Sequence, residues 1–129
     1  MHKFQLKTVN NMKLNNTIDV IKKLHPQTVI LLQISSLYHT YGNDAQIMSY
    51  LFGYQINQNA NGYNECVAPK KAINNILKTL EYNKINYITI VRSQNYEIDQ
   101  KQIYDGQNQY ATIYKKSRKY NAQKNNNKK

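Results

Sequence analysis

The chain has 129 residues, the length of a single folded domain with one modest hydrophobic core, and its formal net charge is +11. One cysteine excludes an internal disulfide and a cysteine zinc site, and no run approaches the roughly 18 apolar residues of a membrane-spanning helix. The N-terminal MHKFQLKTVNNMK lacks the apolar segment of a signal peptide. These features predict a soluble, cytoplasmic protein with no membrane partner.

The first half of the chain predicts one helix and a hairpin. Residues 1–16 are mixed and can hold a short edge strand. Thr17 is a candidate N-cap of a helix of at most two turns that ends at His25-Pro26. The continuous apolar run 29–34 predicts a strand buried on both faces, and residues 37–41 predict its hairpin partner.

The middle of the chain alternates short strands with two helices. Asp44 is a candidate N-cap of a helix that stops at Gly53, and Pro69 lies where the next helix begins. Apolar side chains of that second helix recur at i, i+1, i+4, i+5 and i+8, the clearest amphipathic pattern in the chain. The strands expected here are residues 54–56, 65–68 and 87–91, the last being the final core strand.

The C-terminal part is polar and then basic. Residues 92–109 are expected to be turn-rich, and a helix from Tyr110 is expected to fray within residues 125–129. Residues 115–129 hold seven basic side chains and no acidic one, which indicates either a solvated tail or an electrostatic contact. The candidate phosphate contacts in this run are Lys115, Lys116, Arg118 and Lys119.

These elements predict one α/β (α+β) domain with a mixed β-sheet flanked by helices. The expected boundaries are an N-terminal segment at 1–16, the α/β domain at 17–109, and a basic C-terminal helix with a disordered tail at 110–129. The alternation of short strands with helices is the basis of this fold class.

The order of elements from Thr17 to Val91 resembles the N-terminal mismatch-recognition domain (domain I) of the DNA mismatch-repair protein MutS. The matching motifs are His25-Pro26 at the end of the first helix, Asn43-Asp44-Ala45 after the hairpin, and Val67-Ala68-Pro69 before the amphipathic helix. The spacing from the first helix through the hairpin needs no gaps. The resemblance implies a MutS-like protein, here standing alone, that binds duplex DNA, with mismatched or distorted duplex as the expected ligand.

In that family a Phe-x-Glu on the second strand reads DNA, and this chain has Leu37 and His39 at the matching positions, with Tyr38 between them. A leucine can separate stacked bases as an apolar wedge, but it loses most of the roughly 1–3 kcal/mol that aromatic stacking on a base contributes. His39 can donate or accept a hydrogen bond but lacks the fixed acceptor character of a carboxylate. The predicted nucleic-acid site comprises Leu37, Tyr38 and His39.

Lys70 and Lys71 extend this predicted site. They fall in the first turn of the amphipathic helix, where the helix dipole disfavours cations by a few tenths of a kcal/mol. A phosphate partner would offset that cost, and exposed lysines in a lysine-rich chain are the alternative explanation.

No pattern for catalysis, a metal or a cofactor is present. The four glycines are too dispersed for a phosphate loop, the three histidines lack ligand spacing, and no two of the seven carboxylates form a credible acid/base pair. Cys66 is expected to be a buried, inert thiol. The sequence therefore predicts a non-enzymatic module without a cofactor or small-molecule substrate.

Two functions remain open on the sequence. The first is DNA binding through the predicted nucleic-acid site and the basic run. The second is a protein-interaction module on the same scaffold, which would use the tyrosines of the C-terminal helix, Tyr110, Tyr114 and Tyr120. A contiguous solvent-facing tyrosine patch would favour the protein partner, whereas a basic surface beside Leu37 and His39 would favour DNA.

Overall fold

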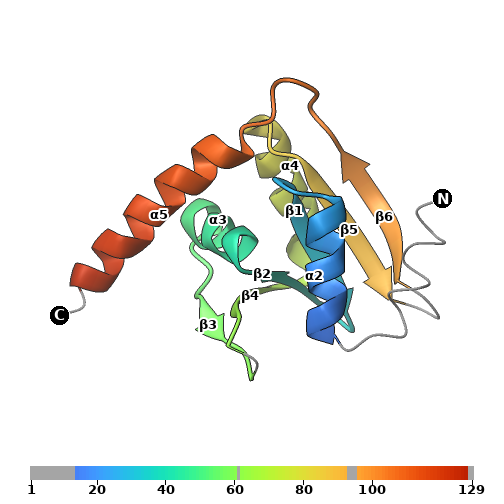
Figure 1. Ribbon diagram of the computed structural model, residues 1–129, viewed down its shortest axis with the longest axis horizontal. Helices are drawn as coiled ribbons and strands as arrows, with labels where there is room; N and C mark the ends of the chain where they lie inside the picture. Colours follow the sequence, from blue (N-terminus) through green and yellow to red (C-terminus); the bar gives the residue numbers. More distant parts are fainter. Residues whose placement is uncertain (1–13, 61, 93–95, 128–129) are drawn as a thin grey trace.

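A six-stranded mixed sheet with helices on both faces forms the body of the protein (Figure 1). The computed structural model describes residues 14–60, 62–92 and 96–127. The strand order is β3-β4-β2-β1-β5-β6. The elements in chain order are α2 (Leu14–Leu24), β1 (Val29–Ile34), β2 (Leu37–Tyr41), α3 (Asn43–Phe52), β3 (Asn57–Gln58), β4 (Asn64–Pro69), the 3₁₀-helix η1 (Lys70–Ala72), α4 (Ile73–Tyr82), β5 (Tyr87–Arg92), β6 (Tyr96–Gln102) and α5 (Tyr110–Asn127).

The central strands β1 and β5 run parallel, from the pair Val29–Tyr87 to the pair Gln33–Val91. Both sequences are rich in β-branched and leucine side chains, which suits strands that are covered on both faces. The remaining strand pairs are antiparallel, and α4 carries the chain from β4 across the sheet to β5.

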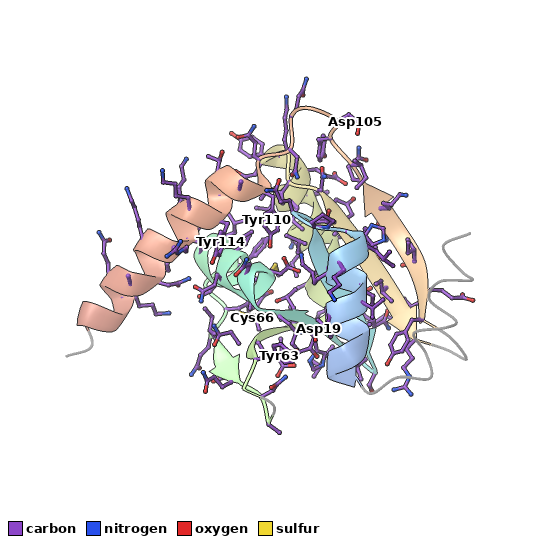
Figure 2. All side chains as sticks on the ribbon, viewed as in Figure 1. Asp19, Tyr63, Cys66, Asp105, Tyr110 and Tyr114 are labelled. Carbon is purple, nitrogen blue, oxygen red and sulfur yellow. The ribbon has the colours of Figure 1, made fainter. Side chains whose placement is uncertain are left out.

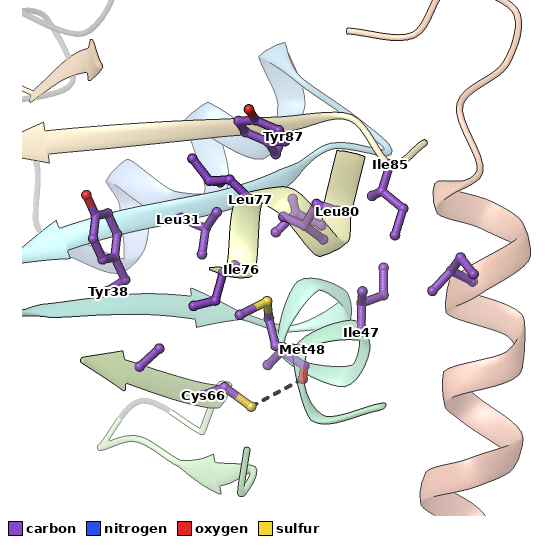
Figure 3. Close-up of a cluster of buried hydrophobic side chains, with 14 of the residues drawn as sticks. Leu31, Tyr38, Ile47, Met48, Cys66, Ile76, Leu77, Leu80, Ile85 and Tyr87 are labelled. Carbon is purple, nitrogen blue, oxygen red and sulfur yellow. Dashed lines mark hydrogen bonds between the residues drawn. The ribbon is translucent and has the colours of Figure 1, made fainter. Parts of the chain in front are cut away.

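Successive side chains along the strands point to opposite faces of the sheet and belong to two separate hydrophobic clusters. Ile30 and Leu32 of β1 face α2, where they pack with Ile18 and Ile21. Leu31 belongs to the opposite cluster, which α3, α4 and the start of α5 cover (Figure 3). Both faces of the sheet are therefore buried, and the sheet is the middle layer of the fold.

A buried carboxylate connects the helices to the sheet. Asp44 is 1% exposed, and its Oδ1 accepts hydrogen bonds from Lys22 Nζ at 3.0 Å and from the Tyr110 hydroxyl at 2.5 Å. Its Oδ2 accepts the backbone N–H of Ile30 at 3.0 Å. Burial raises the pKa of Asp44, and the Lys22 charge and the three hydrogen bonds oppose that rise. The expectation that Asp44 caps α3 is wrong: Gly42 holds the N-cap position, and the Asp44 side chain turns inward.

The mixed, helix-flanked α+β sheet that the sequence predicts is confirmed, but several boundaries differ. α2 spans 11 residues, which is three turns rather than two. Residues 54–56 form no strand. β5 is not the last strand, because β6 pairs with it inside the stretch expected to be turn-rich. The edge strand expected in residues 1–16 lies mostly outside the described residues.

α5 begins at the predicted Tyr110 and stays helical to Asn127. Tyr110 and Ile113 are buried in the cluster shared with α3 and α4, so the start of the basic segment belongs to the folded core. Among the described helices, none has the length and hydropathy to cross a bilayer.

We expect Asp44→Ala to lower the free energy of unfolding by about 3–5 kcal/mol, because it leaves Lys22 and Tyr110 without their shared buried acceptor. Urea denaturation followed by circular dichroism measures this. The matched control is Asp19→Ala, which removes an exposed carboxylate bonded to the Tyr63 hydroxyl (Figure 2). That control should cost at most about 1 kcal/mol, and equal losses in the two variants would contradict the central role of Asp44.

Cys66 should make the protein less stable in alkali. Burial, followed by the negative charge of Glu65, raises the pKa of its thiol to about 11 from the ordinary 9.0. Between these two values the folded state holds more protons than the unfolded state, so stability falls as the pH rises from about 9 to about 11. Urea denaturation across this range should show a shallower fall for Cys66→Ala than for the wild type, and parallel curves would refute the assignment.

Candidate nucleic-acid interface

Leu37 lies at an exposed corner of the sheet. The two-residue turn Ser35-Ser36 joins β1 to β2, with Ser35 in the left-handed region at φ 57°, and Ile34 pairs with Leu37 across it. On its other side Leu37 pairs with Pro69 at the end of β4. Leu37 is 38% exposed, one of the few large apolar side chains of the described residues that the core does not cover.

The two predicted lysines are next to this leucine. The Lys70 backbone N–H donates to the Ser36 carbonyl at 2.9 Å, which holds η1 against the β1–β2 turn. Both lysine side chains are exposed, and they lie in η1 rather than in the first turn of α4. An open, mainly apolar depression joins these groups, lined by Ser36, Leu37, Pro69, Lys70, Lys71, Ile73 and Asn74.

His39 lies two residues along β2, on the same face of the sheet as Leu37. Its Nδ1 is 2.8 Å from Glu65 Oε2 on β4. The imidazole stacks on Tyr41 with ring centroids 6.2 Å apart and planes at 15°. Burial, followed by the charge of Glu65, raises the pKa of the Tyr41 hydroxyl. His39 and Glu65 are partly buried, at 17% and 19% side-chain exposure, so a ligand can still reach the pair.

Tyr38 points to the other face of the sheet and is 4% exposed. It belongs to the cluster that α3 and α4 cover (Figure 3). Its hydroxyl donates to Gln33 Oε1 at 3.2 Å. Tyr38 is thus a core residue, and the structure separates it from Leu37 and His39. It does not belong to the candidate interface.

The predicted cations of α5 are in a different region. Lys115, Lys116, Arg118 and Lys119 are exposed, and Arg118 lies over the Tyr114 ring at 5.9 Å. α5 packs on α3, which follows the far end of β2 from Leu37, and Tyr38 and α5 lie at opposite ends of the core cluster in Figure 3. The structure therefore brings Leu37, Lys70 and Lys71 together and leaves the α5 cations apart from them.

Glu65 is the site residue that the sequence did not reveal. Period-2 alternation in residues 64–69 would have put Glu65 and Val67 on one face. Their distance from His39 depends on the register of β2 against β4, which pairs His39 with Val67 and Tyr41 with Glu65. No sequence pattern specifies that register. Among the described residues, no group of three or more His, Cys, Asp or Glu side chains could hold a metal ion.

Comparison with known protein families agrees with the fold. The family model for MutS domain I matches residues 16–104, which is more than half of the chain. The chain belongs to the MutS domain I family. A search of curated proteins gave no match. The match covers β2, which carries Leu37 and His39, and η1, which carries Lys70 and Lys71.

Stability measurements can separate the exposed and the buried member of the Leu37-Tyr38 dipeptide. Leu37→Ala should change the free energy of unfolding by no more than about 0.5–1 kcal/mol, because the side chain is partly exposed and belongs to neither hydrophobic cluster. Tyr38→Ala should cost about 3–5 kcal/mol, because it opens a cavity in the core. Urea denaturation of both variants measures the difference, and a large loss for Leu37→Ala would show that this leucine is needed for packing.

Proposed function

We propose that this protein is a non-catalytic module that binds duplex DNA at the surface formed by Leu37, Lys70 and Lys71, called here the Leu37 corner. We expect it to prefer mismatched or otherwise distorted duplex. The observation that carries the proposal is an exposed leucine flanked by two exposed lysines in a chain of the MutS domain I family. We infer a non-catalytic role because the matching family, MutS domain I, is a non-catalytic DNA-binding domain.

The Leu37 corner combines an apolar side chain, which suits the base stack, with positive charges, which suit the phosphates. Apolar side chains enter base steps from the minor groove and unstack them, which is easiest where pairing is already weak. Leu37 is partly exposed at the first position of β2, so part of its side chain is available to a groove. Lys70 and Lys71 are held beside it by the bond from the Lys70 N–H to Ser36, in position to meet the flanking phosphates.

α5 adds a second basic surface at the other end of β2. Its four exposed cations attract a polyanion without regard to sequence. We assign them to salt-dependent, non-specific attraction, and we assign base contacts to the Leu37 corner.

The protein-interaction alternative required a solvent-facing patch of tyrosines on α5. Tyr110 is instead buried and bonded to Asp44. Tyr114 is half-buried, and Tyr120 packs edge-on against Tyr50 with centroids 5.6 Å apart. Only Tyr120 of the three is exposed, so they form no contiguous solvent-facing patch. DNA is therefore the better-supported partner.

Fluorescence anisotropy with perfect duplex, mismatched duplex and single-stranded DNA at two salt concentrations tests the proposal. The wild type should bind mismatched duplex best. Leu37→Ala should weaken that binding about tenfold or more, because the wedge loses the burial of a leucine side chain. Lys70→Gln with Lys71→Gln should lower the salt slope by about 1.8, the release expected for two phosphate contacts.

Lys115→Gln with Lys116→Gln is the matched control, since it removes the same charge from α5. It should weaken all three DNA ligands alike and leave the mismatch preference intact. No binding to any ligand, or an undiminished preference in Leu37→Ala, would refute the proposed interface.

A further inference from the structure

His39 and Glu65 form a partly buried pair beside the proposed wedge. They come from neighbouring strands, and the 2.8 Å separation of His39 Nδ1 and Glu65 Oε2 is a hydrogen-bond distance. His39 follows Leu37 by two residues, so both side chains lie on the same face of β2 about 7 Å apart along the strand. A base that Leu37 displaces is therefore within reach of the imidazole.

The pair determines which ring nitrogen carries the proton. An ionised carboxylate can only accept a hydrogen bond, so the bond to Glu65 requires hydrogen on Nδ1. A neutral imidazole protonated at Nδ1 leaves a lone pair on Nε2. Paired with Glu65, the neutral His39 ring is thus an acceptor at its second nitrogen.

The surroundings hold the ring in place. Tyr41 stacks on the imidazole ring, and His39 is paired with Leu32 on β1 and with Val67 on β4. A ring fixed by stacking and one strong hydrogen bond loses little further freedom when it meets a ligand.

We propose that Glu65 is a positioning residue that fixes His39 as a hydrogen-bond acceptor for a ring N–H of an unpaired base. Thymine N3–H and guanine N1–H are the ring donors of this kind in DNA, whereas adenine and cytosine present a lone pair at the equivalent ring position. This inference rests on the proposed DNA binding and adds a chemical selectivity to it.

The tautomer can be measured without DNA. Nitrogen-15 NMR of the His39 ring at pH 8, assigned by its loss in His39→Gln, should show a protonated Nδ1 and an unprotonated Nε2 in the wild type. Glu65→Leu should shift the ring toward the Nε2–H form, since its partner is gone. Wild-type His39 in the Nε2–H form, or protonated on both nitrogens at pH 8, would overturn the inference.

The ligand is tested with a duplex that carries one unpaired thymine, compared with the same duplex carrying N3-methylthymine. Methylation removes the ring donor, so the wild type should lose roughly two- to tenfold in affinity, the worth of one hydrogen bond. Glu65→Leu should show a clearly smaller loss, whereas any steric effect of the methyl group would persist in it.

The outcomes distinguish the two proposals. Wild-type protein that binds neither duplex would refute DNA binding itself. Tight, Leu37-dependent binding with the same methylation loss in the wild type and in Glu65→Leu would keep DNA binding and refute the role of Glu65.

Discussion

The Asp44 carboxylate is the contact on which the arrangement of this fold depends. A buried carboxylate is costly by several kcal/mol unless its partners are all present. Here Lys22 comes from α2, Tyr110 from α5 and the Ile30 N–H from β1, so the charge is satisfied only when the three elements are docked together with α3. Lys22 also lies over the Tyr110 ring at 5.2 Å and donates to the Thr28 carbonyl. The polar cluster therefore specifies how the helices meet the end of the sheet.

β2 connects this polar cluster to the candidate interface. Its last residue, Tyr41, leads into α3 beside Asp44, and its first residue is Leu37. Between them the strand is paired on both sides, with β1 and with β4, so it cannot shift without breaking two ladders. A leucine at the corner and a histidine facing Glu65 are consequences of that register. The interface thus belongs to a rigid sheet rather than to a loop.

The sequence predicts the elements better than the contacts between them. Residues 29–34 and 37–41 carry strong patterns, and both strands occur as expected. β6 was missed because it is an edge strand: Tyr96 and Ile98 alternate toward the core, but Glu97, Asp99 and Lys101 make the stretch resemble a loop.

The polar contacts could be identified only from the structure. Asp44 has the sequence context of an N-cap, and only the approach of Lys22 and Tyr110 explains why its side chain is buried instead. The His39–Glu65 pair likewise depends on strand register, which has no local signature. Leu37 was placed by its family resemblance, and its exposure became known only from the structure.

The packing of α5 on α3 has an energetic consequence for the helix itself. Its cations at 115, 116, 118 and 119 include pairs three and four residues apart, and no acidic side chain on the helix offsets their repulsion. Docked tyrosine and isoleucine side chains, together with the Asn121 bond to Gln46, hold a segment that would unwind on its own. Counter-ions or a polyanion would relieve that repulsion. The order of α5 is therefore coupled to the ionic strength around it.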